Sequence, residues 1–295
     1  MKIFRIILTT VVGTLCSYGL ITGTGLILSY VLLLMGGIFL ILGVTDKVFV
    51  IGRSNLETVL FFLCIILVAS VLQTSTGFGF SIMATPFLLL LFLPQEAIQI
   101  NIILSVLISV SLIWKISTDI DFILLKRFIM GSIVGVPFGI LIFISINISA
   151  FKIGVSIMFL MLTFLLICNF RVKPTRIRDF IVGGLSGILT TSIGMPGPPL
   201  LIYFTGTDTE KEKLRATTLA FYLFIYFISL ITQIIFTGTN KLIWESSLYA
   251  IPIVFLGLFI GQIIFKWLNE RIFKIFTYIL LSFTGIYLLI ESLNS

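Results

Sequence analysis

Two stretches decide the fold of this chain: residues 73–80, QTSTGFGF, and residues 190–199, TTSIGMPGPP. Each lies inside a long apolar run, 57–93 or 179–205, and each places glycines or adjacent prolines where a helix would otherwise continue. Both contain the pattern Thr-Ser-x-Gly, so the two stretches align as an internal repeat. We therefore predict that each run is a broken helical hairpin whose two arms enter and leave on the same face.

The composition around these stretches identifies the solvent. Hydrophobic residues make up 59% of the 295 residues and charged residues only 11%, against about 25% charged in soluble domains. Continuous apolar runs of this length predict membrane helices rather than the alternating strands of a barrel. We predict an all-α polytopic membrane protein, a single transmembrane domain over residues 1–295. Its apolar segments are 4–22, 25–44, 57–93, 97–114, 127–146, 151–170, 179–205, 214–236, 246–266 and 271–291.

The order of these segments predicts two inverted repeats. Each hairpin is followed by three ordinary spans, and an odd number of crossings reverses the second repeat relative to the first. The repeats cover residues 56–170 and 178–295, and residues 1–50 form an extra N-terminal helical pair without an assigned role. The second span after each hairpin carries glycines four residues apart, a spacing that lets helices approach closely in lipid. These glycines are Gly131, Gly135 and Gly139, and Gly257 and Gly261.

The basic residues agree with this topology. Most of them fall in four loops that the inverted arrangement places on one side, which the positive-inside rule makes cytoplasmic. These loops are 115–127, 171–178, 206–215 and 266–274. The net charge of +7 is therefore explained by orientation in the membrane rather than by a nucleic-acid partner.

The breaks also predict a binding site. Helix ends inside a membrane leave backbone N–H groups free to bind an anion, and hydroxyls nearby can add donors. Two breaks that enter from opposite faces would converge near mid-membrane. The predicted substrate-binding residues in the breaks are Thr74, Ser75, Gly77, Phe78, Gly79, Thr191, Ser192, Gly194, Pro196 and Gly197. Pro86, Pro198 and Pro199 are expected in the first turn of the returning half-helices.

Three further candidates open the spans that follow the hairpins: Asn101, Arg215 and Thr218. Arg215 has two open roles. It is either a cytoplasmic anchor of the positive-inside kind or a planar donor that attracts an oxyanion.

With these motifs described, the chain resembles the TauE/SafE family of sulfite exporters, also called the TSUP family. The resemblance rests on the stretch from Gly77 to Pro86, on residues 194–199 and on the duplicated layout, and it covers about residues 56–295. It implies transport of small anions, often sulfur-containing ones such as sulfite, sulfoacetate or thiosulfate, across a bacterial plasma membrane. We therefore expect a secondary transporter that works by alternating access at the hairpin tips. The substrate, the direction, the coupling ion and the oligomeric state stay open.

The main alternative is an intramembrane enzyme that acts on a lipid or polyprenyl phosphate. Such chemistry needs a carboxylate or histidine as acid and base, yet the chain has no histidine and its carboxylates fall in loops or at span ends. We expect no enzymatic activity. The three cysteines lie far apart, so we also expect no metal site, no disulfide framework and no cofactor. The expected partners are a small anionic solute and membrane lipids, but not nucleic acid, and a homo-oligomer stays open.

Overall fold

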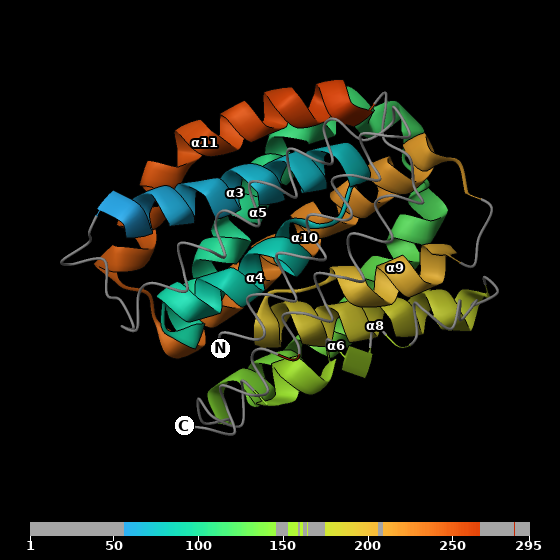
Figure 1. Cartoon of the computed structure of the whole chain (residues 1–295). Coiled ribbons are helices and arrows are strands. Elements are labelled where there is room, and N and C mark those ends of the chain that lie inside the picture. The colour runs from blue at the N-terminus through green and yellow to red at the C-terminus, as the bar shows by residue number, and fades with distance from the viewer. Residues whose placement is uncertain are drawn as a thin grey trace. The chain divides into compact units, whose positions relative to one another are not determined.

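Helices form every regular element in the described part of the chain, as predicted (Figure 1). The computed structural model describes residues 56–145, 153–158, 160, 161, 164, 175–205, 209–265 and 286. The predicted pair in residues 1–50, most of the span 151–170 and the span 271–291 lie outside these residues. The helices are α3 (Leu56–Thr76), α4 (Phe80–Leu91), α5 (Pro94–Ile116), the 3-10 turn η2 (Ser117–Asp119), α6 (Phe122–Ser145), α8 (Arg176–Ile193), α9 (Gly197–Thr205), α10 (Lys211–Thr237) and α11 (Lys241–Phe265).

The chain divides into two compact units, residues 1–64 and 65–295. Helix α3 begins in the first unit and continues into the second. All contacts described below lie within residues 65–295.

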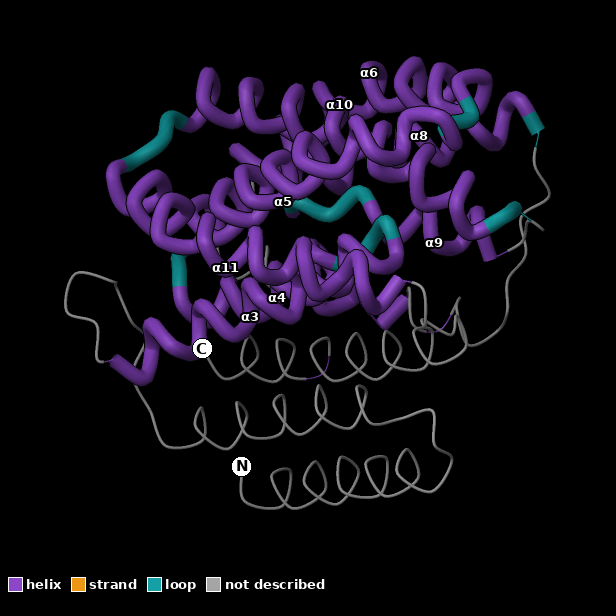
Figure 2. Tube along the Cα trace, turned by 90° about the horizontal axis from the view of Figure 1, so that it is seen from above, coloured by secondary structure: helices purple, strands orange, loops and turns teal. Residues whose placement is uncertain are grey.

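Both predicted hairpins are broken where the sequence indicates. After α3 the chain turns and α4 runs back, and α9 runs back in the same way after α8 (Figure 1). In Figure 2 the loops that follow α3 and α8 lie among the helices, whereas other loops lie at the helix ends. The expected place of Pro86 was wrong. It lies in the middle of α4, because Gly77 and Gly79 end the preceding turn and the new helix already begins at Phe80.

Five helices, α3, α5, α6, α10 and α11, are long and apolar enough to cross a membrane. Helix α3 has 21 residues and is about 31 Å long, so the first arm of the first hairpin alone matches the thickness of a bilayer core. The short returning arm, α4, has 12 residues. The two arms of this hairpin therefore differ in length, which the apolar run 57–93 did not reveal.

Side chains are distributed as in a protein dissolved in lipid. Large apolar side chains such as Phe138 on α6 and Phe259 on α11 are exposed, by 56% and 66%. Polar side chains such as Gln73, Asn101 and Gln233 are fully buried instead. This arrangement is stable where the surrounding solvent is apolar and the polar groups meet one another inside.

The spaced glycines of α6 pack against α8. A Cβ atom added to Gly135 would overlap the carbonyl oxygen of Gly184 and would lie 3.0 Å from the Ile188 nitrogen. A Cβ atom on Gly139 would lie 2.6 Å from the Ile188 carbonyl oxygen and 2.8 Å from Cβ of Thr191. The predicted close approach of helices at these glycines is confirmed, and it joins α6 of the first half to α8 of the second.

The glycines of α11 make the corresponding contacts with α3. A Cβ atom on Gly257 would lie 3.2 Å from the Leu67 carbonyl oxygen and 3.3 Å from the Val71 nitrogen. On Gly261 it would lie 2.8 Å from the Val71 carbonyl oxygen and 2.6 Å from Cβ of Thr74. The same backbone atoms, at matching positions of α3 and α8, therefore receive glycines from the other half of the chain.

Ion pairs tie the predicted cytoplasmic loops together at one end of the helices. Lys213, in the first turn of α10, pairs with Asp121 before α6 at 3.0 Å. Arg127 in the first turns of α6 pairs with Asp179 in the first turn of α8 at 2.8 Å. Three of the four basic loops thus meet through these pairs.

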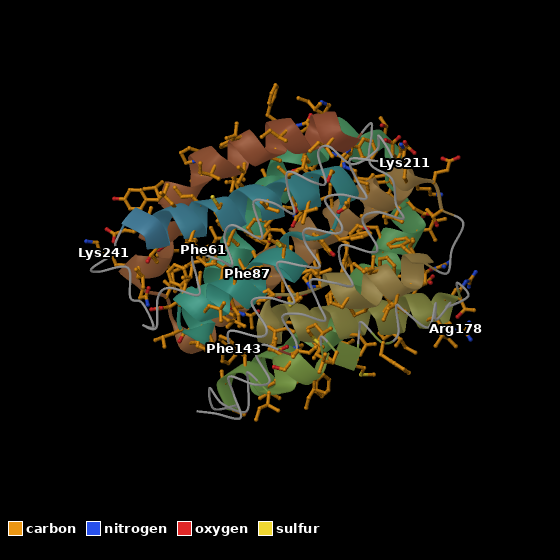
Figure 3. All side chains as sticks on the ribbon, in the orientation of Figure 1. Phe61, Phe87, Phe143, Arg178, Lys211 and Lys241 are labelled. Carbon is orange, nitrogen blue, oxygen red and sulfur yellow. The ribbon has the colours of Figure 1, made fainter. Side chains whose placement is uncertain are left out.

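Lys241 and its neighbours lie at the end of the helices opposite these ion pairs. In Figure 3, Arg178 and Lys211 lie at the right-hand end and Lys241 lies at the left. At Lys241's end the Asn240 amide donates to the Glu96 carboxylate at 2.8 Å, which joins the start of α11 to the start of α5. The prediction that the basic loops gather at one end is confirmed for the described residues.

Candidate functional site

The first hairpin breaks because its backbone enters conformations that glycine adopts most readily. Gly77 has a φ of 85° and Gly79 a φ of 137°. The Gly77 N–H donates to the Gln73 carbonyl at 2.8 Å, and the Phe78 N–H donates to the Thr76 hydroxyl at 3.2 Å. The end of α3 is thus closed locally. The first-turn N–H groups of α4, by contrast, have no acceptor within their own helix.

The second hairpin breaks at Gly194, which adopts the left-handed conformation with a φ of 73°. Its N–H donates to the Thr190 carbonyl at 2.8 Å, and the next N–H, of Met195, donates to the Leu189 carbonyl at 3.2 Å. Helix α9 then begins with Gly197, followed by two prolines that carry no N–H. The start of α9 therefore offers fewer backbone donors than the start of α4.

Each tip glycine rests against a helix of the other half. A Cβ atom on Gly77 would lie 2.9 Å from Cα and 3.1 Å from Cγ of Arg215 on α10. A Cβ atom on Gly194 would lie 3.2 Å from Ile98 and 2.8 Å from the amide nitrogen of Asn101, both on α5. Ile98 stands 21 residues after Gly77, as Arg215 does after Gly194. The two tips are therefore held in equivalent places by equivalent positions.

Asn101 is engaged by the second tip. Its amide nitrogen donates to the Gly194 carbonyl at 2.7 Å, while its own carbonyl oxygen has no partner in the described residues. The Pro196 carbonyl in the same loop accepts from the Ser186 hydroxyl at 3.0 Å. The loop at the second tip is thus held by side chains that have already used their donors on it.

Arg215 is differently placed. Its side chain is only 8% exposed, and its guanidinium carbon lies 4.2 Å from the ring centroid of Phe265, the last residue of α11. Its Nε has no hydrogen-bond partner and its guanidinium has no ion pair in the described part of the chain. A buried arginine thus lies against the first tip through its backbone and Cγ, with its guanidinium over Phe265.

The same face of α10 carries two further polar groups, Thr218 and Tyr222, which follow Arg215 at helical spacing. Both are buried, and neither hydroxyl has a partner among the residues described. The Tyr222 hydroxyl lies 2.9 Å from where a Cβ atom of Gly197 would be, and Ile82 near the start of α4 contacts the same point. The starts of the two half-helices therefore meet beside Tyr222, as the converging breaks predict.

The hydroxyls expected in the site have mixed fates. Ser75 and Ser192 donate back to their own helices, to the carbonyls of Val71 (2.8 Å) and Ile188 (2.7 Å). The Thr191 hydroxyl pairs with that of Ser229 on α10 at 2.8 Å. These three groups have their donors or acceptors occupied by protein.

Thr74 and Phe78 are both buried. The Thr74 hydroxyl has no partner in the described residues, and the same holds for both amide atoms of Gln73, the residue before it. Unsatisfied polar atoms thus accumulate along the end of α3, close to the tip that contacts Arg215.

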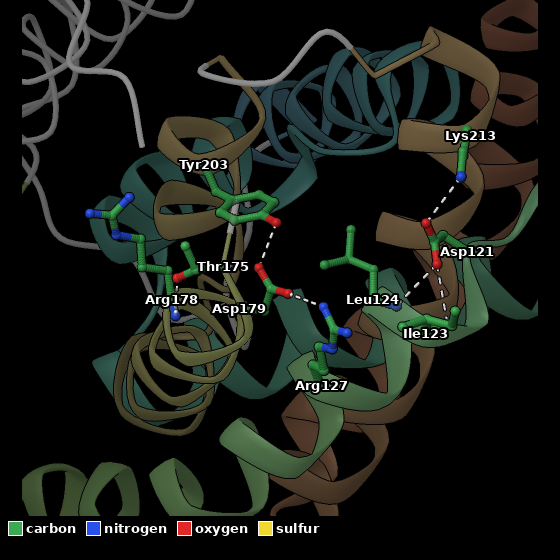
Figure 4. Close-up of polar contacts among 9 residues, drawn as sticks. All are labelled: Asp121, Ile123, Leu124, Arg127, Thr175, Arg178, Asp179, Tyr203 and Lys213. Carbon is green, nitrogen blue, oxygen red and sulfur yellow. Dashed lines mark hydrogen bonds and ion pairs between the residues drawn. The ribbon is translucent and has the colours of Figure 1, made fainter. Parts of the chain in front are cut away.

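A second polar cluster, Arg127, Asp179 and Tyr203, joins three helices (Figure 4). The Asp179 carboxylate is 2% exposed, pairs with Arg127 of α6 at 2.8 Å and accepts from the Tyr203 hydroxyl of α9 at 2.6 Å. The sequence placed Asp179 at a span end without a role. In the structure, the two bonds of Asp179 hold the start of α8 against α6 and against the returning arm α9.

Residues 61–288 match the protein family described as sulfite exporter TauE/SafE. The chain belongs to the TauE/SafE family. No curated protein and no solved structure matches it. Membership in the TauE/SafE family implies a membrane exporter of sulfite or related anions, and together with the five apolar helices it identifies a multi-pass membrane protein.

Tyr222 of this TauE/SafE chain was not among the residues predicted from the sequence, because a tyrosine within an apolar helix is usually a packing residue. A signal for it was present. Tyr222 follows Arg215 and Thr218 at positions i+7 and i+4, on one face of a helix. The Asp179 cluster carried no comparable signal, because Arg127 stands 52 residues away in the sequence.

Proposed function

We propose that this protein is a secondary transporter of small anions that binds its substrate between the first hairpin tip and α10, by alternating access within two inverted repeats. The observation that carries the proposal is the burial of Arg215, whose backbone and Cγ lie against Gly77 and whose guanidinium lies over Phe265. The sulfur-containing character of the anion, such as sulfite, thiosulfate or an organosulfonate, follows from the family. A bacterial plasma membrane is the corresponding location.

The burial of Arg215 argues against a role as a membrane-surface anchor. Lys211 and Lys213, the first and third residues of the same helix, have side chains 47% and 48% exposed, as anchors at a membrane surface should. Arg215 is withdrawn from water, and a buried charge without a counter-charge is strongly destabilising. An anionic substrate would supply that charge.

The surroundings of Arg215 suit an oxyanion. A guanidinium offers planar donors to two oxygens at once, and the Thr218 hydroxyl lies on the same helix face. The free N–H groups at the start of α4 add the favourable end of a helix dipole. Donors of several kinds would thus be available to an anion bound between the first tip and α10.

The matched contacts of the two halves support an inverted repeat. Gly77 with Arg215 corresponds to Gly194 with Ile98, and each contact joins a tip to the other half. In a transporter of this architecture, movement of one hairpin changes the wall of the site presented by the other half.

The enzyme alternative gains no comparable observation. Asp179 is the buried carboxylate of the described residues, and both of its oxygens are bound, to Arg127 and Tyr203. A carboxylate held in this way has a structural partner for each oxygen and is poorly suited to exchange protons with a substrate.

The test is transport by the purified protein in proteoliposomes, with sulfite, thiosulfate and sulfoacetate compared with acetate and succinate. Arg215→Gln should weaken the apparent affinity for the transported anion by about 10- to 100-fold, the value of one hydrogen bond to a charged group. Arg215→Lys should recover only part of this loss, because an ammonium lacks the planar fork.

Lys211→Gln is the matched control, since it removes an exposed cation one turn earlier on α10. Its affinity should equal that of the wild type. Unaltered affinity in Arg215→Gln, with insertion confirmed, would exclude Arg215 from the site.

A further inference from the structure

The Tyr222 side chain has a polar group that the fold does not satisfy. It is 1% exposed, and its hydroxyl has no hydrogen-bond partner within the described residues. A buried hydroxyl without a partner is costly, and in a membrane no bulk water is at hand to supply one. Such a group needs a bound molecule, either water or substrate, to complete its hydrogen bonding.

Tyr226 shows what a structural tyrosine looks like at the same place. It stands one turn further along α10, is equally buried and packs its ring against that of Tyr222 at 5.3 Å between centroids. Its hydroxyl, however, is hydrogen-bonded to that of Ser81 at the start of α4. The two residues thus share helix, burial and ring packing, and differ in whether the hydroxyl has a protein partner.

The position of the Tyr222 hydroxyl explains why it is free. It points at Gly197, the first residue of α9, where a side chain would stand 2.9 Å from it. The first turn of α9 keeps the N–H of Gly197 and loses those of Pro198 and Pro199. The hydroxyl therefore lies at the first residue of this half-helix, whose first turn has this single N–H.

Tyr222 and Arg215 mark two separate ends of a polar strip. They stand seven residues apart, which is about 10 Å along the helix. The Arg215 guanidinium lies over Phe265, at the end of α11, whereas the Tyr222 hydroxyl lies at Gly197. Thr218, whose hydroxyl is also without a partner in the described part of the chain, stands between them.

We infer that Tyr222 is a specificity-determining residue that contacts the end of the substrate remote from Arg215. The strip fits an anion of two or three carbons with its sulfonate or other oxyanion at Arg215 and a hydrogen-bonding group at the far end. This inference rests on the proposed function and adds to it the second contact and the shape of the substrate. A compact anion would leave Tyr222 unsatisfied.

The test compares two probes of equal charge and similar length, isethionate and ethanesulfonate, which differ only in the terminal hydroxyl of isethionate. Binding to the purified full-length protein in detergent is measured by isothermal titration for the wild type, Tyr222→Phe, Tyr226→Phe and Arg215→Gln. The wild type should bind isethionate about 5- to 10-fold more tightly than ethanesulfonate, the value of one hydrogen bond.

Tyr222→Phe should bring the two affinities to the same value by weakening isethionate alone. Tyr226→Phe, the matched control, should keep the wild-type ratio, because its hydroxyl serves Ser81. A Tyr222→Phe protein that keeps the ratio, or a wild type that binds sulfite but neither sulfonate, overturns the inference.

The two proposals fail separately. If Arg215→Gln loses binding of both sulfonates while Tyr222→Phe keeps the ratio, only the role of Tyr222 is wrong. If Arg215→Gln binds sulfite and both sulfonates as the wild type does, the proposed site itself is wrong.

Discussion

The two hairpin tips are built alike and face different partners. Each breaks at a glycine of positive φ, Gly77 or Gly194, and each rests on a helix of the other half. The first tip meets the buried cation of Arg215, whereas the second meets the neutral amide of Asn101, which already donates to its carbonyl. The repeated sequence thus sets the geometry twice, and the residue at one matched position gives one tip its charge.

This difference separates two tasks within one architecture. Beside the first tip, the Arg215 Nε has no partner among the described residues, and the first turn of α4 contains no proline. The second tip is tied by Asn101, and α9 starts with two residues that have no N–H. We therefore propose that the anion is recognised mainly beside the first tip, and that the second tip mainly forms the opposite wall of the site.

The largest expected effect comes from adding one methyl group to each tip. Gly77→Ala should abolish transport, because the new Cβ would meet the backbone of Arg215 at 2.9 Å. Gly194→Ala should retain part of the activity, because its Cβ would meet the movable end of the Asn101 side chain at 2.8 Å. Transport rates in proteoliposomes, corrected for the amount inserted, check both.

Gly238→Ala is the control for backbone strain alone. Gly238 has a φ of 75° with no atom within 4 Å of its Cβ position, so alanine there costs only the left-handed conformation, about 1–2 kcal/mol. If Gly77→Ala is no worse than Gly238→Ala, the contact with Arg215 does not matter for transport.

A second, smaller effect should separate stability from affinity. Asn101→Ala leaves the Gly194 carbonyl without its donor, and we expect it to lower the free energy of unfolding by about 1–3 kcal/mol while the apparent affinity for the anion stays unchanged. Arg215→Gln should instead weaken the apparent affinity for the anion and leave the free energy of unfolding unchanged. Thermal unfolding in detergent and transport affinity, measured for both variants, decide this. Equal losses of affinity would mean that both tips bind the substrate.

The smallest expected effect comes from Asp121. Its carboxylate pairs with Lys213 in the first turn of α10, the helix that contacts the first tip. Burial raises the pKa of the Asp121 carboxyl, but hydrogen bonds from the Leu124 and Ile123 amides and the nearby Lys213 ammonium outweigh it, so the net pKa is below its ordinary value. The ionised carboxylate therefore stabilises the fold above the unfolded pKa of about 4, and this contribution is lost as the pH falls through the lower folded pKa.

Asp121→Asn should accordingly be less stable than the wild type at pH 7 by under about 1 kcal/mol, since the carboxylate is partly exposed. The difference should disappear near pH 3. Melting temperatures of both proteins across this range measure it, and a difference that does not change with pH would show that Asp121 acts by packing rather than by charge.

Much of the fold could be predicted because its signals are local. Apolar length gives the helices, and the glycines at residues 77 and 194 give the breaks. Pro86 was misleading, because a proline in an apolar run is typical of a helix start, whereas α4 already begins at Phe80, directly after Gly79. The unequal arms of the first hairpin were hidden for the same reason.

The site was less predictable because burial depends on distant segments. Whether Arg215 acts as a membrane-surface anchor or as a substrate-binding residue depends on its contacts with Phe265 and with the first tip, which are far from it in sequence. The partner of the Ser81 hydroxyl is likewise on another helix, and the lack of one at Tyr222 is visible only in the folded chain. Side-chain type and spacing define candidates, and tertiary contacts decide between them.

The glycine contacts also determine which helices of this protein can move together as rigid bodies. Helix α6 is bound to α8, and α11 to α3, through backbone contacts that leave no room for a methyl group. A hinge at the boundary between the two sequence halves would have to pull these pairs apart. We therefore expect two rigid units, α6 with α8 and α3 with α11, each of which combines a hairpin arm from one half with a span from the other. Neither sequence half would then move as a unit.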